Sequence, residues 1–207
     1  PYTLIGILLS ADKIGMLVGD LPAGMLIRRL GIKRAMLAGI LLAGVSTTAL
    51  FWAVSISDAF FYLFLSGFGT SLYAVTRHTW IVEAISIDLR GRAISLLGGI
   101  FRIGNFVGPV AGGAIAAAFG LRVPFLFFGI AYLASLIANA IFLPQMNRAE
   151  VSARHAKKIR LKDVMSMLGD QRSSITWASA GCLFMQMVRS GPSIIIPLYA
   201  ADVLNLD

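Results

Sequence analysis

The stretch Gly99-Ile-Phe-Arg-Ile-Gly-Asn-Phe-Val-Gly-Pro-Val-Ala-Gly-Gly113 lies inside a long apolar run and predicts a membrane-spanning helix. Three of its glycines, Gly104, Gly108 and Gly112, recur every four residues and form one smooth stripe. Small residues at this spacing let a second helix approach closely in lipid. The stripe therefore predicts a helix-packing face.

The same helix carries a proline and a charge. Pro109 removes a backbone donor, so we expect a bend there. Arg102 lies two residues before Gly104, about 200° around the helix and nearly opposite the stripe. A charge inside a membrane indicates a functional residue. The alternative is a packing helix whose arginine finds a partner.

The composition places the protein in a membrane. Of its 207 residues, 57% are hydrophobic and 14% are charged, and the mean hydropathy is +0.81. A soluble domain carries more charge, and apolar runs of this length exceed what one core can hold. The net charge of +8 suggests nucleic acid, but the basic residues lie mostly between apolar runs, which excludes that partner. The single Cys182 excludes an internal disulfide.

Six apolar runs each reach about the 20 residues that a helix needs to cross a bilayer. They are residues 4–27, 35–54, 59–85, 93–119, 123–143 and 175–200. The connections between them alternate in charge: residues 28–34 hold basic residues and no acid, whereas residues 55–58 hold no basic residue. The positive-inside rule places connections 28–34, 86–92 and 144–174 in the cytoplasm and both ends of the sequence outside. If the full protein begins in the cytoplasm, an odd number of spans precedes this sequence, one being the simplest number.

Charged residues at similar depth in three runs predict a polar cluster. Arg77 and Arg102 each lie roughly 15 Å from the cytoplasmic ends of their helices, and Asp20 lies roughly 12 Å from its own. Charges of both signs at one level are expected to face a bundle interior or a watery cavity. Tyr73 shares the face of Arg77. Asp20 either neutralises an arginine or carries a proton, and both readings stay open.

Two further charges are candidates for the same site. Glu83, near the cytoplasmic end of its run, either pairs with a neighbour such as Arg29 or takes part in coupling. Arg189 either lines a cavity or reaches outward. The sequence contains no nucleophile with a base, no phosphate-binding loop and no metal-ligand cluster, so an enzyme is not expected.

The turn after the first run resembles a signature of the major facilitator superfamily of secondary transporters. It reads Gly24-Met-Leu-Ile-Arg-Arg-Leu-Gly-Ile-Lys-Arg34, and Arg28 stands where the family usually has Asp. The resemblance implies a cytoplasmic gating loop, in which Glu83 or Asp88 supplies the acid that Arg28 replaces. The matching residues are Gly24, Leu26, Arg29, Gly31, Lys33 and Arg34.

The glycine-proline stretch resembles a second signature, typical of the antiporter branches of that family. Arg77 is similar in placement to the signature Arg of the fourth helix, although the Gln and Gly that often follow it are absent. The resemblance to this family covers essentially the whole sequence. The residues that match the glycine-proline signature are Gly104, Gly108, Pro109, Gly112 and Gly113.

The resemblance implies an all-α integral membrane fold of about twelve helices in two pseudo-symmetric six-helix bundles. The six runs then correspond to helices two to seven. Residues 1–143 would form the first bundle without its first helix, 144–174 a basic cytoplasmic connection, and 175–207 the seventh helix and the start of an external loop.

These expectations lead to a secondary active transporter working by alternating access. The antiporter-like helix favours proton-coupled export of a small molecule, and two midplane arginines favour an anionic substrate. Two alternatives stay open: an uptake symporter or facilitator of the same fold, and a non-transporting membrane sensor or assembly protein. We expect no cofactor, H⁺ as the coupling ion, a multi-pass monomer in the cytoplasmic membrane, and no partners besides substrate and lipid.

Overall fold

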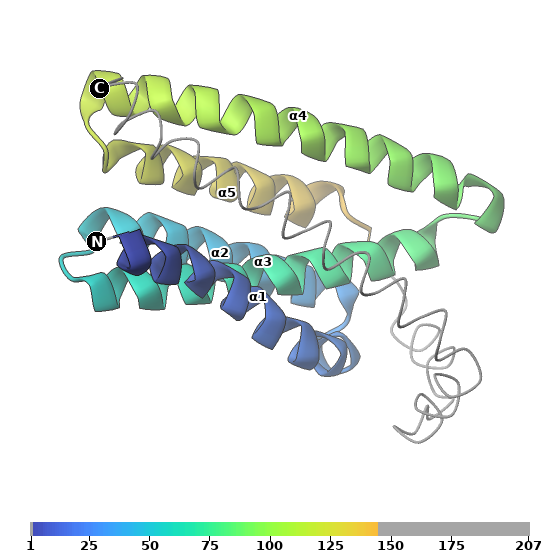
Figure 1. Ribbon diagram of the computed structural model, residues 1–207. Helices are drawn as coiled ribbons and strands as arrows, with labels where there is room; N and C mark the ends of the chain where they lie inside the picture. Colours follow the sequence, from blue (N-terminus) through green and yellow to red (C-terminus); the bar gives the residue numbers. More distant parts are fainter. Residues whose placement is uncertain (1, 145–207) are drawn as a thin grey trace, which may run out of the picture. The chain divides into compact units, whose positions relative to one another are not determined.

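The structure, a computed structural model, describes residues 2–144, which belong to one compact unit, Pro1–Ala153. Five α-helices and a short 3-10 helix follow one another in these residues (Figure 1). They are α1 Tyr2–Leu30, α2 Ile32–Ala49, η1 Leu50–Trp52, α3 Ile56–Ala84, α4 Ile87–Phe119 and α5 Val123–Phe142. The predicted basic connection 144–174, the sixth span and Arg189 lie outside the described residues.

The helices agree with the first five predicted spans. Within the described part, the helices α2 to α5 are long and apolar enough to cross a membrane. Helix α1 has 29 residues, which corresponds to roughly 43 Å, and it carries Asp12, Lys13 and Asp20 along its length. Helix α4 runs without interruption through Pro109, and the bend expected there stays a prediction.

Two connections between helices are shorter than the sequence suggested. Gly31 alone separates α1 from α2, so Arg28 and Arg29 form the last turn of one helix and Lys33 lies in the first turn of the next. Gly31 has a φ of 84°, a conformation that costs little only for glycine, and it reverses the chain in a single residue. Likewise α4 begins at Ile87, so the span predicted from residue 93 starts six residues too late.

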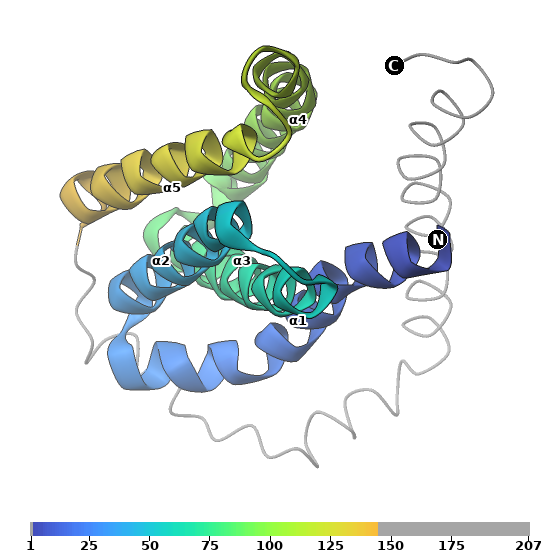
Figure 2. The same ribbon diagram turned by 90° about the vertical axis from the view of Figure 1, so that its left-hand side faces the viewer.

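Helix α3 is the centre of this unit. It packs against α1 on one side and α2 on the other, and α2 also packs against α5. Figures 1 and 2 show α1, α2 and α3 lying together, with α4 beside α5. Helix α4 makes few contacts with its neighbours and, within residues 2–144, has no buried residue.

Glycines line the close helix contacts. A Cβ atom on Gly39 of α2 would lie 2.7 Å from the Tyr73 nitrogen of α3, and one on Gly69 of α3 would lie 2.5 Å from the Ala43 nitrogen of α2. Such distances leave no room for a side chain, so the backbones touch as small-residue motifs allow. The same holds for Gly15 and Gly19 of α1 against Phe64 and Phe68, and for Gly67 of α3 against Asp12.

The glycine stripe predicted in α4 has few neighbours in the described unit, unlike the close-packed glycines of α1, α2 and α3. A Cβ on Gly104, Gly108 or Gly113 would meet no atom within 4 Å among the residues described. Only at Gly112 does the stripe have a neighbour, the ring of Phe128 in α5, at 3.2 Å. The packing role of this stripe therefore stays a prediction, and the close packing seen in the unit comes from other glycines.

Candidate functional site

Asp20 of α1 points to α3 rather than to an arginine. The hydroxyl Oγ of Ser71 donates a short hydrogen bond of 2.5 Å to Asp20 Oδ1. Ser71 is 1% exposed, whereas Asp20 is exposed. No ion pair joins Asp20 to Arg77 or Arg102 in the part of the chain that the structure describes. Ser71 was missed from the sequence, since a serine in an apolar run gives no sign of its neighbour.

Arg77 of α3 has an aromatic partner and an unused donor. Its guanidinium carbon lies 5.4 Å from the centre of the Tyr73 ring, one turn earlier on the same face, a cation–π contact. Its Nε atom is buried and has no hydrogen-bond partner among the described residues, and the same is true of Nε1 of Trp80. The structure thus brings Tyr73 and Arg77 together, as their spacing predicts, and leaves two buried donors on this face without an acceptor among the described residues.

A cavity of about 170 Å³ adjoins Arg77 between α3 and α4. Its α4 wall comes from the N-terminal half of that helix and contains Phe101. His78 lines the cavity too, but its Nδ1 is paired with the Ala74 carbonyl at 2.7 Å. Arg77 is therefore the lining residue with a charge and an unsatisfied donor. The complete lining is Arg77, His78, Ile81, Ile94, Leu97, Gly98 and Phe101.

The other predicted site residues lie apart from this cavity. Arg102 follows Phe101 directly but is exposed and does not line it. Glu83 lies in the last turn of α3 and is half-buried. The single cluster predicted from depth is thus divided in the described unit: Asp20 bonds Ser71, Arg77 stacks on Tyr73, and Arg102 is exposed.

Basic residues near the α1–α2 and α3–α4 connections cap helix ends. Arg90 donates from Nε to the Ile85 carbonyl at 3.0 Å and from Nη2 to the Val82 carbonyl at 2.5 Å, so it closes the end of α3. Lys33 donates from Nζ to the Leu143 carbonyl at 2.6 Å, at the end of α5. Cations are favourable at helix C-termini because the last carbonyls are unpaired and carry partial negative charge.

The predicted gating loop is thus assembled around helix ends. Arg28 and Arg29 add charge in the last turn of α1, and Arg34 is exposed. Gly24 lies in the helix α1 with open space around it, and Gly31 supplies the reversal. The loop signature therefore describes two helix termini and the one-residue turn between them.

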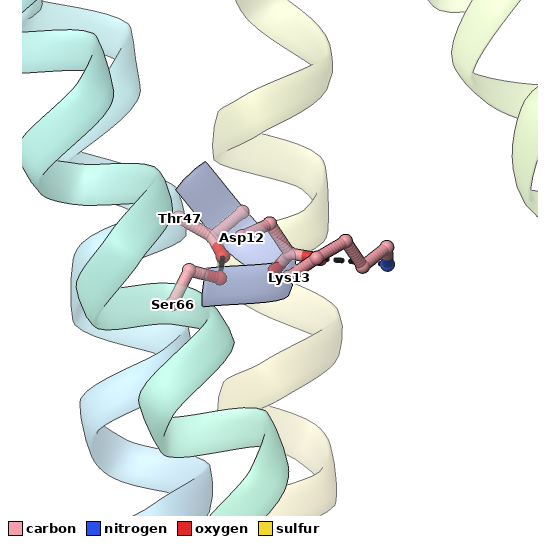
Figure 3. Close-up of polar contacts among 4 residues, drawn as sticks. All are labelled: Asp12, Lys13, Thr47 and Ser66. Carbon is pink, nitrogen blue, oxygen red and sulfur yellow. Dashed lines mark hydrogen bonds and ion pairs between the residues drawn. The ribbon is translucent and has the colours of Figure 1, made fainter. Parts of the chain in front are cut away.

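A separate set of polar contacts lies on α1 and between α2 and α3. Figure 3 shows Lys13 Nζ paired with Asp12 Oδ2 at 2.8 Å, and the hydroxyls of Thr47 and Ser66 in contact at 2.9 Å. Lys13 has 71% of its side chain exposed, whereas Ser66 is 8% exposed and joins α3 to α2. The Thr47–Ser66 bond satisfies two hydroxyls inside the bundle.

A larger cavity of about 340 Å³ lies between α2 and α5 and has almost entirely apolar walls, including Leu41, Val45 and Leu133. It contains no charged residue. Within residues 2–144, no three His, Cys, Asp or Glu side chains gather in a way that could hold a metal.

Comparison with known proteins gives relatives among transporters. Multidrug resistance protein 2 of Bacillus subtilis (strain 168) is 24% identical over 171 residues, which is 83% of this chain and 42% of that protein. The 4-hydroxybenzoate transporter PcaK of Acinetobacter baylyi (strain ATCC 33305 / BD413 / ADP1) is 25% identical over 169 residues, 81% of this chain and 36% of that protein. The chain therefore spans less than half the length of these relatives.

A solved structure shows the same fold. The xylose transporter XylE from E. coli, in a partially occluded inward-open conformation, matches with a TM-score of 0.66 at 16% identity, over 94% of this chain and 50% of that one. The family model of the Major Facilitator Superfamily matches residues 1–207. The protein is thus a multi-pass membrane protein of helical fold, and it belongs to the major facilitator superfamily.

Proposed function

We propose that the full-length protein is a secondary transporter of the cytoplasmic membrane that exports a small organic molecule in exchange for protons. Family membership and the two transporter relatives support transport. The similarity to a multidrug resistance protein and the glycine-proline stretch of α4 favour export. Asp20 and Arg77, on two neighbouring helices, supply charges of both signs for coupling.

One observation carries the proposed site: Arg77 lines a cavity and keeps a buried donor that has no acceptor among the described residues. A buried donor left unpaired is destabilising by about 1–3 kcal/mol, and more when it is charged. A carboxylate or similar group of a substrate would satisfy the guanidinium with charge-assisted hydrogen bonds. The relative that transports 4-hydroxybenzoate is consistent with an anionic substrate.

Asp20 is our candidate for the proton carrier. Ser71 donates to one of its carboxylate oxygens, and among the described residues no hydrogen bond to the second oxygen is present. Helix α1 packs on α3, which also carries Arg77, so substrate binding at Arg77 and protonation at Asp20 act on neighbouring helices. Coupling between two such sites is reciprocal, because each ligand changes the affinity for the other by the same factor.

The test uses the full-length protein in proteoliposomes with two probes, radiolabelled 4-hydroxybenzoate as an anion and ethidium as a lipophilic cation. We expect flux of the anion, loss of that flux in Arg77→Gln, and partial recovery in Arg77→Lys. His78→Ala is the matched control, since it changes a wall of the same cavity without removing the free donor. Undiminished anion flux in Arg77→Gln, or flux of ethidium alone, would contradict the assignment of Arg77.

The same vesicles separate the alternatives. Export by antiport requires protons to move opposite to the substrate, whereas an uptake symporter moves both in one direction. The relative described as a 4-hydroxybenzoate transporter is the observation that keeps the second function under consideration. A sensor or assembly protein would bind a probe without moving it.

A further inference from the structure

Lys33 occupies a position that its own helix does not favour. It lies in the first turn of α2, where the helix dipole is positive and an acid would be stabilising. That turn contains no acidic residue, and Arg34 adds a second cation to it. Interactions within α2 therefore do not explain a cation here.

The partner of Lys33 belongs to a distant part of the chain. Its ammonium reaches the carbonyl of Leu143, the residue that caps the C-terminus of α5, at 2.6 Å and in a half-buried setting. The ammonium thus meets an unpaired carbonyl at the negative end of α5. Arg90 makes a local cap, five and eight residues from its acceptors, whereas the Lys33 contact joins residues 110 apart.

We propose that Lys33 is a positioning residue that fastens the α1–α2 turn to the end of α5. Only Gly31 separates α1 from α2. The hydrogen bond from Lys33, in the first turn of α2, therefore links the α1–α2 turn to the end of α5. The chain leaves α5 at Leu143. Through this bond, the α1–α2 turn and the C-terminal end of α5 move together. This role involves no contact with substrate or proton and goes beyond the proposed function.

The first test needs no transport. In the full-length protein carrying Arg34→Lys, two neighbouring amines compete for an amine-acetylating reagent, and mass spectrometry measures their rates. The half-buried amine of Lys33 must leave the Leu143 carbonyl before the reagent can reach it, whereas residue 34 is exposed. We expect Lys33 to react roughly two- to fivefold more slowly than the introduced amine, the factor typical of a cation at a helix C-terminus. Equal rates would overturn the contact.

The second test uses Lys33→Met, with Lys33→Arg as the conservative variant and Arg34→Met as the matched control. Amide hydrogen exchange in residues 139–143 should accelerate roughly two- to fivefold in Lys33→Met, return toward the original rate in Lys33→Arg, and stay unchanged in Arg34→Met. Exchange at the end of α3, which Arg90 caps, should not change. Unchanged exchange at residues 139–143 in Lys33→Met would refute the positioning role.

Transport kinetics give a third and separate readout. For 4-hydroxybenzoate we expect Lys33→Met to lower the maximal transport rate and leave the KM unchanged. The reason is that the α1–α2 turn moves with the bundle and does not contact the probe. A changed KM at an unchanged maximal rate would place Lys33 at the binding site and contradict our assignment. If the protein moves no probe, the proposed function fails while the acetylation and exchange tests still decide the role of Lys33.

Discussion

Helices α3 and α4 have similar lengths, 29 and 33 residues, and both contain closely spaced glycines, yet they are held in different ways. Helix α3 packs against α1 and α2. It is capped by Ser55 and Asp58 at its start and by Arg90 at its end. Helix α4 buries no residue within the described unit, and its N-cap Ser86 makes no side-chain cap bond. The comparison teaches that glycine spacing shows where close packing is possible, whereas burial shows where it occurs.

The largest expected effect is on the packed helix. Gly67→Leu places a side chain where α3 meets the Asp12 backbone of α1, and no flexible group can give way there. We expect a loss of about 3 kcal/mol or more, at the upper end of overpacking costs, and a protein with a strongly lowered Tm. Gly104→Leu, the same change in an open stretch of α4, serves as the control and should leave the Tm nearly unchanged. Equal Tm shifts for the two variants would remove the distinction between the helices.

Gly108→Leu sharpens the comparison by separating folding from transport. Gly108 meets no atom within 4 Å in the described unit, so the variant should insert and fold normally. If the stripe serves as a face against which another helix moves, a leucine keeps the two helices apart and flux in proteoliposomes stops. Normal flux from a normally folded Gly108→Leu protein would remove the stripe from the mechanism.

A smaller effect is expected at the one-residue turn. Gly31→Ala forces a side chain into a positive-φ conformation and should cost about 1–2 kcal/mol, although the space around it is open. Gly24→Ala, in the helical interior of α1 and equally open, should instead stabilise by about 0.5–1 kcal/mol. Opposite shifts of Tm are thus expected from the same substitution seven residues apart. Two shifts of the same sign would mean that the turn does not require a positive φ at residue 31.

The smallest effect tests the helix starts. The hydroxyl of Ser55 accepts from the Asp58 amide at 3.1 Å, and Asp58 returns a bond to the Ser55 amide at 3.0 Å. Ser55→Ala should therefore cost about 1 kcal/mol of unfolding free energy. Ser86→Ala at the start of α4 removes no such bond and should be close to neutral. A larger loss at Ser86 than at Ser55 would reverse the comparison.

Much of the fold could be predicted from the sequence because apolar length and charge distribution are local properties. The five described helices lie where the hydrophobic runs placed them, and the signature residues led to the family that the comparisons establish. The close contacts were harder to predict. Gly67 and Gly69 are two residues apart and face different neighbours, α1 and α2, so they form no stripe along one face.

The site was less predictable for a related reason. Depth along a helix placed Asp20, Arg77 and Arg102 at one level, but depth does not give the direction in which each side chain points. The partner of Asp20 proved to be Ser71, and the wall opposite Arg77 proved to be Phe101 and its apolar neighbours rather than Arg102. Gly15 and Gly19 are a contrasting case. Their spacing of four residues predicts close packing, and both lie on α1, which packs against α3.

The central claim, that a carboxylate on the packed side of the unit couples protons to transport, is tested most directly by Asp20→Asn. In proteoliposomes of the full-length protein, pH-driven accumulation of 4-hydroxybenzoate and its exchange in the absence of a pH gradient are measured side by side. We predict that accumulation is lost while exchange persists, and that Ser71→Ala, which keeps the carboxyl group, still accumulates the probe. Undiminished pH-driven accumulation in a folded Asp20→Asn protein would contradict the account.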